Sequence, residues 1–222
     1  MKIDIIGTGS NGNCFMFNDS IMIDAGLPIK KIKEKVDVSK ITHVLLTHIH
    51  QDHLNKTTIR KMFVDNRNII FMCGSFLVDS MYDIGIPEKN IIEVRENVIY
   101  DVGIFKVSPF SLYHDVQNFG YRLAKDGHKH IHATDTSTLY GISAKDYDTA
   151  TIECNHHLPT ALAIIDDAED AGKFTHLKGA INSHLNVEET IQFCKRNNIK
   201  KLYPIHIGLS TKREVIDRLK AW

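Results

Sequence analysis

The pattern of apolar and polar positions predicts a chain in which short strands alternate with amphipathic helices. Turn signals at Asn18-Asp19-Ser20 and Asp126-Gly127 each predict a hairpin between two strands. Period-two or wholly apolar runs predict strands at Lys2–Gly7, Cys14–Asn18, Ser20–Asp24, Thr42–Thr47, Ile69–Met72, Ile91–Val94, Val98–Tyr100, Phe105–Phe110, Phe119–Lys125, Lys129–Ala133, Ala150–Glu153 and Leu202–Ile205. Helical spacing predicts helices at Pro28–Val36, Thr57–Val64, Ser75–Asp83, Ala161–Ala171, Val187–Asn197 and Thr211–Ala221. We therefore expect one mixed α/β domain over residues 1–222, with two sheets packed face to face and helices outside.

The composition is that of an ordinary folded protein and narrows the classes of partner. Hydrophobic residues make up 43% and charged residues 24% of the 222 residues. No apolar run approaches the ~20 residues of a membrane span, and the N-terminus lacks a signal-peptide pattern, so we expect a cytoplasmic protein without a membrane partner. The 27 basic and 27 acidic residues argue against a large basic surface for long nucleic acid, although a local patch stays open. The four cysteines form no C-x-x-C pair and are expected in the core.

Residues Gly7 to Gly12 fit the pattern G-x-G-x-x-G directly after a predicted strand. Dinucleotide binding would require a helix to begin there, so that its N–H groups face a pyrophosphate. The next residues, CFMFNDSIMID, predict two more strands instead. We therefore interpret the segment as a glycine-rich turn between strands, which can border a pocket.

The segment Thr47–His53, THIHQDH, carries the strongest chemical signal among the 13 histidines. In an extended segment, residues two apart point the same way, so His48 and His50 are expected side by side at a strand end. Asp52 and His53 follow as the chain turns toward a helix. Imidazole nitrogen and carboxylate oxygen suit zinc, and also manganese or iron, and this spacing can serve two neighbouring cations.

Further ligand-type residues follow other apolar runs. His114 follows Ser108–Tyr113, Asp135 follows Lys129–Ala133, and His206 follows Leu202–Ile205. Each alone is more often a loop residue or a satisfied core histidine. Their repeated place at a strand end predicts that they meet at one edge of the sheets.

These motifs together resemble the metallo-β-lactamase-fold hydrolases over essentially the whole chain, including GTGSNGNCFMFNDSIMIDAG at the start. The resemblance implies a four-layer αββα sandwich and two divalent metal ions, zinc or manganese. On the same resemblance, the first metal is held by His48, His50 and His114, the second by Asp52, His53 and His206, and Asp135 bridges both.

The segments GSNGNCFMF, HDVQNFGYR, IECNHHLP and SHLNVEET look similar to the YycJ-like branch, bacterial proteins similar to RNase J and RNase Z and regarded as DNA exonucleases. Asn155-His156-His157 and His206-Ile207-Gly208 depart from that branch's N-H-D and H-L-S. Phage proteins of this fold, some of which hydrolyse cyclic nucleotides, look similar too. The origin, bacterial or phage in a host cytoplasm, stays open, and a homodimer is expected on resemblance alone.

The mechanism implied is attack on phosphorus by a water activated between two metals. Asp52 is expected to orient that water, and His184, ahead of a predicted helix, to protonate the leaving group. A structural role for His184, as a helix cap or a packing residue, is an alternative of equal weight. Asn155, His156 and His184 are the expected substrate contacts.

The lead hypothesis is a phosphodiesterase for nucleic acid or nucleotides, either a DNA exonuclease or a cyclic-nucleotide phosphodiesterase. Two alternatives stay open: a carboxyl-ester or thioester hydrolase of the same fold, and a non-catalytic, metal-stabilised binding protein. His128, His130 and His132 alternate along one strand and are expected on a hairpin arm facing water.

Overall fold

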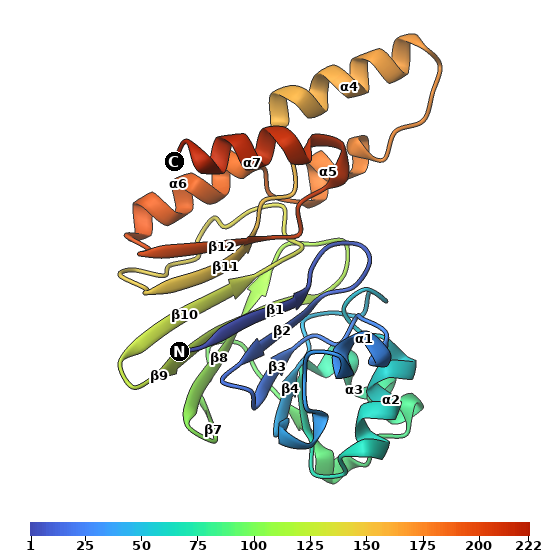
Figure 1. Ribbon diagram of the computed structural model, residues 1–222, viewed down its shortest axis with the longest axis vertical. Helices are drawn as coiled ribbons and strands as arrows, with labels where there is room; N and C mark the ends of the chain where they lie inside the picture. The colour runs from blue at the N-terminus through green and yellow to red at the C-terminus, as the bar shows by residue number, and fades with distance from the viewer. The chain divides into compact units, whose positions relative to one another are not determined.

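The computed structural model describes residues 1–222 and contains twelve strands in two six-stranded sheets, together with seven α-helices (Figure 1). The strand orders are β1-β2-β3-β4-β5-β6 and β12-β11-β10-β9-β8-β7. The mixed α/β class is therefore confirmed. The chain divides into two compact units, Met1–Ser111 and Leu112–Trp222. A single domain over residues 1–222 stays a prediction.

In the first unit, helices cover one face of a sheet whose first three strands are antiparallel and whose later strands are parallel. Figure 1 shows α1, α2 and α3 grouped beside β1–β4. Met22, Val44 and Phe71 of the sheet belong to one buried cluster with Ile59 of α2 and Leu77 of α3. The elements are β1 (Ile3–Gly7), β2 (Cys14–Phe17), β3 (Ile21–Ile23), α1 (Ile29–Lys33), β4 (His43–Leu45), α2 (Lys56–Asp65), β5 (Ile70–Cys73), α3 (Ser75–Ile84), β6 (Ile91–Glu93), β7 (Tyr100–Val102) and β8 (Phe105–Leu112).

In the second unit, β10, β11 and β12 are parallel, and β9 pairs antiparallel with β10 through the Asp126-Gly127 turn. Both turn residues have positive φ, 49° and 77°, as the predicted hairpin requires. Helices α6 and α7 lie along β11 and β12 (Figure 1). The elements are β9 (Asn118–Lys125), β10 (His128–Ala133), β11 (Thr149–Glu153), α4 (Leu158–Asp170), α5 (Leu177–Ser183), α6 (Val187–Asn197), β12 (Lys201–Ile205) and α7 (Lys212–Lys220).

Helix α5 is the one α-helix that the sequence pattern did not predict. Its sequence, LKGAINS, contains a glycine and two residues that favour turns, so its intrinsic helix propensity is low. The helix is held by packing, because buried Leu177 and partly buried Ile181 lie against Ala161 and Ile165 of α4. Tertiary contact therefore overrides propensity here.

The expectation that the histidines of β10 face water is wrong. His130 and His132 are fully buried, and they form an alternating ladder with two threonines of β11. The hydroxyl of Thr149 lies 2.9 Å from Nε2 of His128 and 2.8 Å from Nδ1 of His130. The hydroxyl of Thr151 lies 2.9 Å from Nε2 of His130 and 2.8 Å from Nδ1 of His132. Hydroxyls both donate and accept, so the ladder gives both ring nitrogens of a neutral His130 a partner inside the protein.

This ladder should make the protein sensitive to acid. Burial is the main cause that holds the pKa of His130 well below 6.5, and electrostatic repulsion from His132 and His128 adds to it. The unfolded chain binds a proton below about pH 6.5 that the folded chain excludes, so stability falls as the pH falls. Below pH 6, the free energy of unfolding of wild type should fall by up to about 1.4 kcal/mol more per pH unit than that of His130→Gln. Urea unfolding of both proteins from pH 8 to 5 measures the difference. Parallel stability curves would contradict a buried, neutral His130.

Candidate metal centre

The first unit gathers the histidines of the THIHQDH segment at the end of β4. Nε2 of His48 lies 3.2 Å from Nδ1 of His50, and their ring centroids are 4.8 Å apart. The ring centroid of His53 lies 4.2 Å from that of His48. The chain turns between these residues, since the N–H groups of His53 and Leu54 both donate to the carbonyl of His50. The predicted side-by-side placement of His48 and His50 is confirmed.

Asp24 fixes the orientation of His53. It follows β3, which is the parallel neighbour of β4, with φ at +58° and its carboxylate fully buried. The carboxylate accepts hydrogen bonds from the N–H and hydroxyl of Thr47 at 2.9 and 2.8 Å and lies 2.6 Å from Nδ1 of His53. Burial raises the pKa of Asp24, while His53 and Thr47 oppose that rise.

The other ring nitrogen of His53, Nε2, lies 2.7 Å from the amide Nδ2 of Asn13. With Nδ1–H donated to Asp24, Nε2 carries a lone pair that can accept from that amide. A carboxylate on the far ring nitrogen is also the usual support of a metal-binding histidine. Asp52 lies beside it, with Oδ2 3.6 Å from Nε2 of His53. These donors fit a divalent cation.

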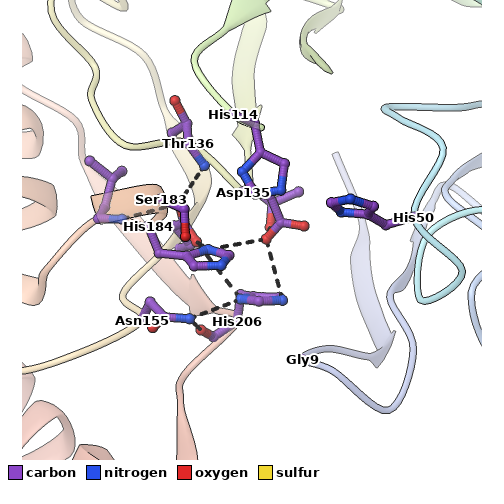
Figure 2. A network of polar contacts seen from close by, with 12 residues as sticks. Gly9, His50, His114, Asp135, Thr136, Asn155, Ser183, His184 and His206 are labelled. Atoms are coloured by element: carbon purple, nitrogen blue, oxygen red, sulfur yellow. Dashed lines mark hydrogen bonds and ion pairs between the residues drawn. The ribbon is translucent and has the colours of Figure 1, made fainter. Parts of the chain in front are cut away.

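The second unit places Asp135 and His206 together beyond the ends of β10 and β12 (Figure 2). Nε2 of His206 lies 3.3 Å from Oδ1 of Asp135. Both residues adopt the left-handed backbone conformation, with φ of +53° and +50°, which is uncommon for residues other than glycine. Such strain is typical of functional sites.

Glu153 and His184 complete this second cluster, and Figure 2 shows His184 beside Asp135 and His206. Nδ1 of His184 lies 2.9 Å from Oε2 of Glu153 and 3.6 Å from Oδ1 of Asp135. The fully buried carboxylate of Glu153 also accepts from the backbone N–H groups of Thr136 and Leu185 at 2.7 and 3.2 Å. Ligand atoms of Asp135, Glu153, His184 and His206 all lie within 4.8 Å of one another, so this cluster alone can hold a cation.

The remaining predicted residues lie around this cluster. The ring of His114 lies 5.4 Å from the ring of His184. The amide Nδ2 of Asn155 lies 3.1 Å from Nδ1 of His206, so Asn155 positions that ring. His156 is 1% exposed. Its pKa is lowered to about 4, mainly by burial and further by electrostatic repulsion from His184 and His157. Contact of Asn155 or His156 with substrate stays a prediction.

Glu153 and the carboxylate support from Asp24 are features of the site that sequence reasoning did not assign. A signal for Glu153 was present, because TATIE places one carboxylate in a wholly buried strand. Buried carboxylates need hydrogen-bonding or charged partners, so such a residue indicates a polar site nearby.

Comparison with known proteins identifies the family. Residues 20–207 match the model of the Beta-lactamase superfamily domain. The chain belongs to this superfamily. No curated protein sequence matches the chain.

Solved structures of metallo-β-lactamase-fold proteins resemble this superfamily member along nearly all of its length. YhfI from Bacillus subtilis has a TM-score of 0.75 and 16% identity, covering 99% of this chain and 91% of its own. Zinc-bound PqqB from Methylobacterium extorquens has a TM-score of 0.73 and 14% identity, covering 100% and 95%. The short form of human tRNase Z has a TM-score of 0.71 and 16% identity, covering 94% and 93%. At these identities the likeness shows the fold, which confirms the expected metallo-β-lactamase fold.

Asp24→Asn tests the support that this superfamily member gives to His53. The amide is isosteric but lacks the charge that holds Nδ1–H of His53, so zinc affinity should fall by about 10- to 100-fold. Competition with a chromogenic chelator measures the affinity, and Asp79→Asn, at an exposed position of α3, serves as the matched control. Equal affinity in both variants would show that Asp24 only stabilises the fold.

Proposed function

We propose that the protein is a phosphodiesterase with two divalent metal ions that hydrolyses nucleotide or nucleic-acid phosphodiesters. The observation that carries the proposal is the His184–Glu153 pair beside Asp135 and His206. Hydrolysis of a phosphodiester breaks one P–O ester bond and releases an alkoxide, which needs a proton, and an imidazole held by a buried carboxylate can supply one.

The ligands proposed are the seven histidine and aspartate residues that the sequence resemblance implies. His48, His50 and His114 would hold one cation, Asp52, His53 and His206 the other, and Asp135 would bridge them. Imidazole and carboxylate donors fit zinc or manganese. Cations bound there would supply Lewis acidity toward the phosphate oxygens and an activated water.

Side chains of the protein then orient the water, donate a proton and position a ligand ring. Asp52, whose Oδ2 lies 3.3 Å from the amide Nδ2 of Asn13, orients the attacking water. His184 donates its Nε2 proton to the leaving oxygen, while Glu153 holds Nδ1–H and stabilises the charged ring. Asn155 keeps the ring of His206 in place.

A substrate panel tests this function. Bis-p-nitrophenyl phosphate, linear DNA, RNA, cyclic mononucleotides, a thioester and a lactone are each incubated with zinc-loaded and manganese-loaded protein. We expect hydrolysis of bis-p-nitrophenyl phosphate and of at least one nucleotide substrate, and none without metal. Hydrolysis of the carboxyl esters alone would contradict the proposal and favour the ester hydrolase alternative.

A further inference from the structure

A hollow of about 420 Å³ in the first unit lies beside Asp52 and is not used by the chemistry above. It is lined by Ser10 and Asn11 of the glycine-rich loop and by Gly26, Pro28, Gln51, Asp52 and Asn55. Its volume lies within the range of about 300–1,000 Å³ that small-molecule sites occupy. The G-x-G-x-x-G segment therefore borders a pocket, without opening a helix.

The loop is fixed against the candidate metal ligands by Asn13 and two glycines. The buried side chain of Asn13 accepts from the N–H of Gly9 at 2.8 Å and donates to the backbone carbonyl of Asp52 at 3.3 Å. A Cβ on Gly26 would lie 1.7 Å from the carbonyl oxygen of Asp52. A Cβ on Gly12, whose φ is +125°, would lie 2.9 Å from the carbonyl oxygen of Gly26. The backbone can approach Asp52 this closely only because both positions are glycine.

The lining combines polar side chains with the apolar ring of Pro28 and carries no cation. Ser10 supplies a hydroxyl, Asn11, Gln51 and Asn55 supply amides, and Asp52 is the one charged side chain among the lining residues. Amides and hydroxyls both donate and accept hydrogen bonds, which suits a neutral heterocycle or sugar. A further phosphate would meet a carboxylate and no lysine or arginine, so the hollow disfavours a second anion.

We propose that this hollow binds the nucleoside part of the substrate while the scissile phosphate lies at the metals. This inference rests on the proposed phosphodiesterase function and adds a specificity site to it. Asn11 and Gln51 are the residues assigned to nucleoside recognition, because their amides are exposed and are not metal ligands in the proposal.

Two chromogenic substrates that share a leaving group test the assignment. Thymidine 5′-(p-nitrophenyl phosphate) carries a nucleoside, whereas bis-p-nitrophenyl phosphate does not, and both release p-nitrophenol. Wild type should prefer the thymidine ester in kcat/KM. Asn11→Ala and Gln51→Ala should each reduce that preference about tenfold, chiefly through KM, as expected when a hydrogen bond worth about 1.4 kcal/mol is lost. Asn68→Ala, at an exposed asparagine of the same unit, is the matched control and should leave the preference unchanged.

The outcomes separate the two proposals. If wild type hydrolyses neither ester in the presence of metal, the phosphodiesterase function fails. If wild type hydrolyses both esters without preferring the thymidine ester, the nucleoside site is refuted and the phosphodiesterase function stands. The same conclusion follows if both alanine variants show a preference within twofold of that of wild type. Adenosine, which lacks phosphate, should inhibit wild type more strongly than Asn11→Ala, whereas equal inhibition would also overturn the assignment.

Discussion

Replacing His50 with alanine should lower kcat/KM for bis-p-nitrophenyl phosphate by about 1,000-fold or more. The proposal makes His50 a ligand of one cation, and its ring lies against that of His48. Loss of the cation removes its stabilisation of transition-state charge, which is worth several kcal/mol, and about 4 kcal/mol corresponds to that factor. Steady-state kinetics with zinc or manganese in excess measure the effect.

His176→Ala is the matched control for this experiment. His176 is exposed at the N-terminus of α5, where its ring contacts Phe174. The control should retain activity within about twofold, as surface substitutions usually change little. Full activity in His50→Ala would remove His50 from the catalytic assignment.

His184→Ala should lower kcat by about 100- to 1,000-fold while the metal content stays near that of wild type. General acids contribute about 10²–10⁴-fold to rate, and the proposal gives His184 the proton of the leaving group rather than a metal. A leaving group of low pKa needs less help, so p-nitrophenyl esters should be affected less than a nucleotide with an alkoxide leaving group. Kinetics on both substrate types and metal analysis of the same samples measure these effects.

Glu153 should act through His184. Its carboxylate lies 2.9 Å from Nδ1 of His184, so Glu153→Gln should also lower kcat. In the double variant, His184→Ala should lower kcat little further than Glu153→Gln does alone. Loss of metal in His184→Ala would instead make His184 a ligand, because ligand atoms of His184, Asp135, Glu153 and His206 lie within 4.8 Å of one another. Additive rate losses would contradict a shared role of the pair.

Much of the fold could be predicted because its signals are local. The Asp126-Gly127 turn, the apolar runs of the strands and the spacing of α6 all agree with the structure. The gathering of His48, His50 and His53 could be predicted for the same reason, since THIHQDH concentrates them in one segment. Helix α5 could not be predicted, because packing against α4 holds it despite its composition.

Long-range pairing accounts for what the sequence did not reveal. His130 has the alternating spacing of an exposed hairpin arm, and only the pairing of β10 with β11 shows that Thr149 and Thr151 satisfy it inside the protein. The carboxylate of Asp24 similarly reaches His53, 29 positions away in the sequence, through the neighbouring strands β3 and β4. No sequence window of ordinary length contains either partnership.

The structure also bears on the membrane prediction, since none of the helices has the length and apolar character needed to cross a bilayer. The identity of the substrate and the oligomeric state are set by residues at the protein surface, not by the buried pairs formed by His130 and Asp24.

Elemental analysis of protein purified without chelator tests the proposed pair of metal ions. We expect two divalent transition-metal ions per chain in wild type, a loss of bound metal in His48→Ala and His53→Ala, and return of hydrolytic activity when metal is added back to chelator-treated wild type. Protein that contains no transition metal, and that gains no activity when zinc or manganese is supplied, would contradict a metal-dependent hydrolase.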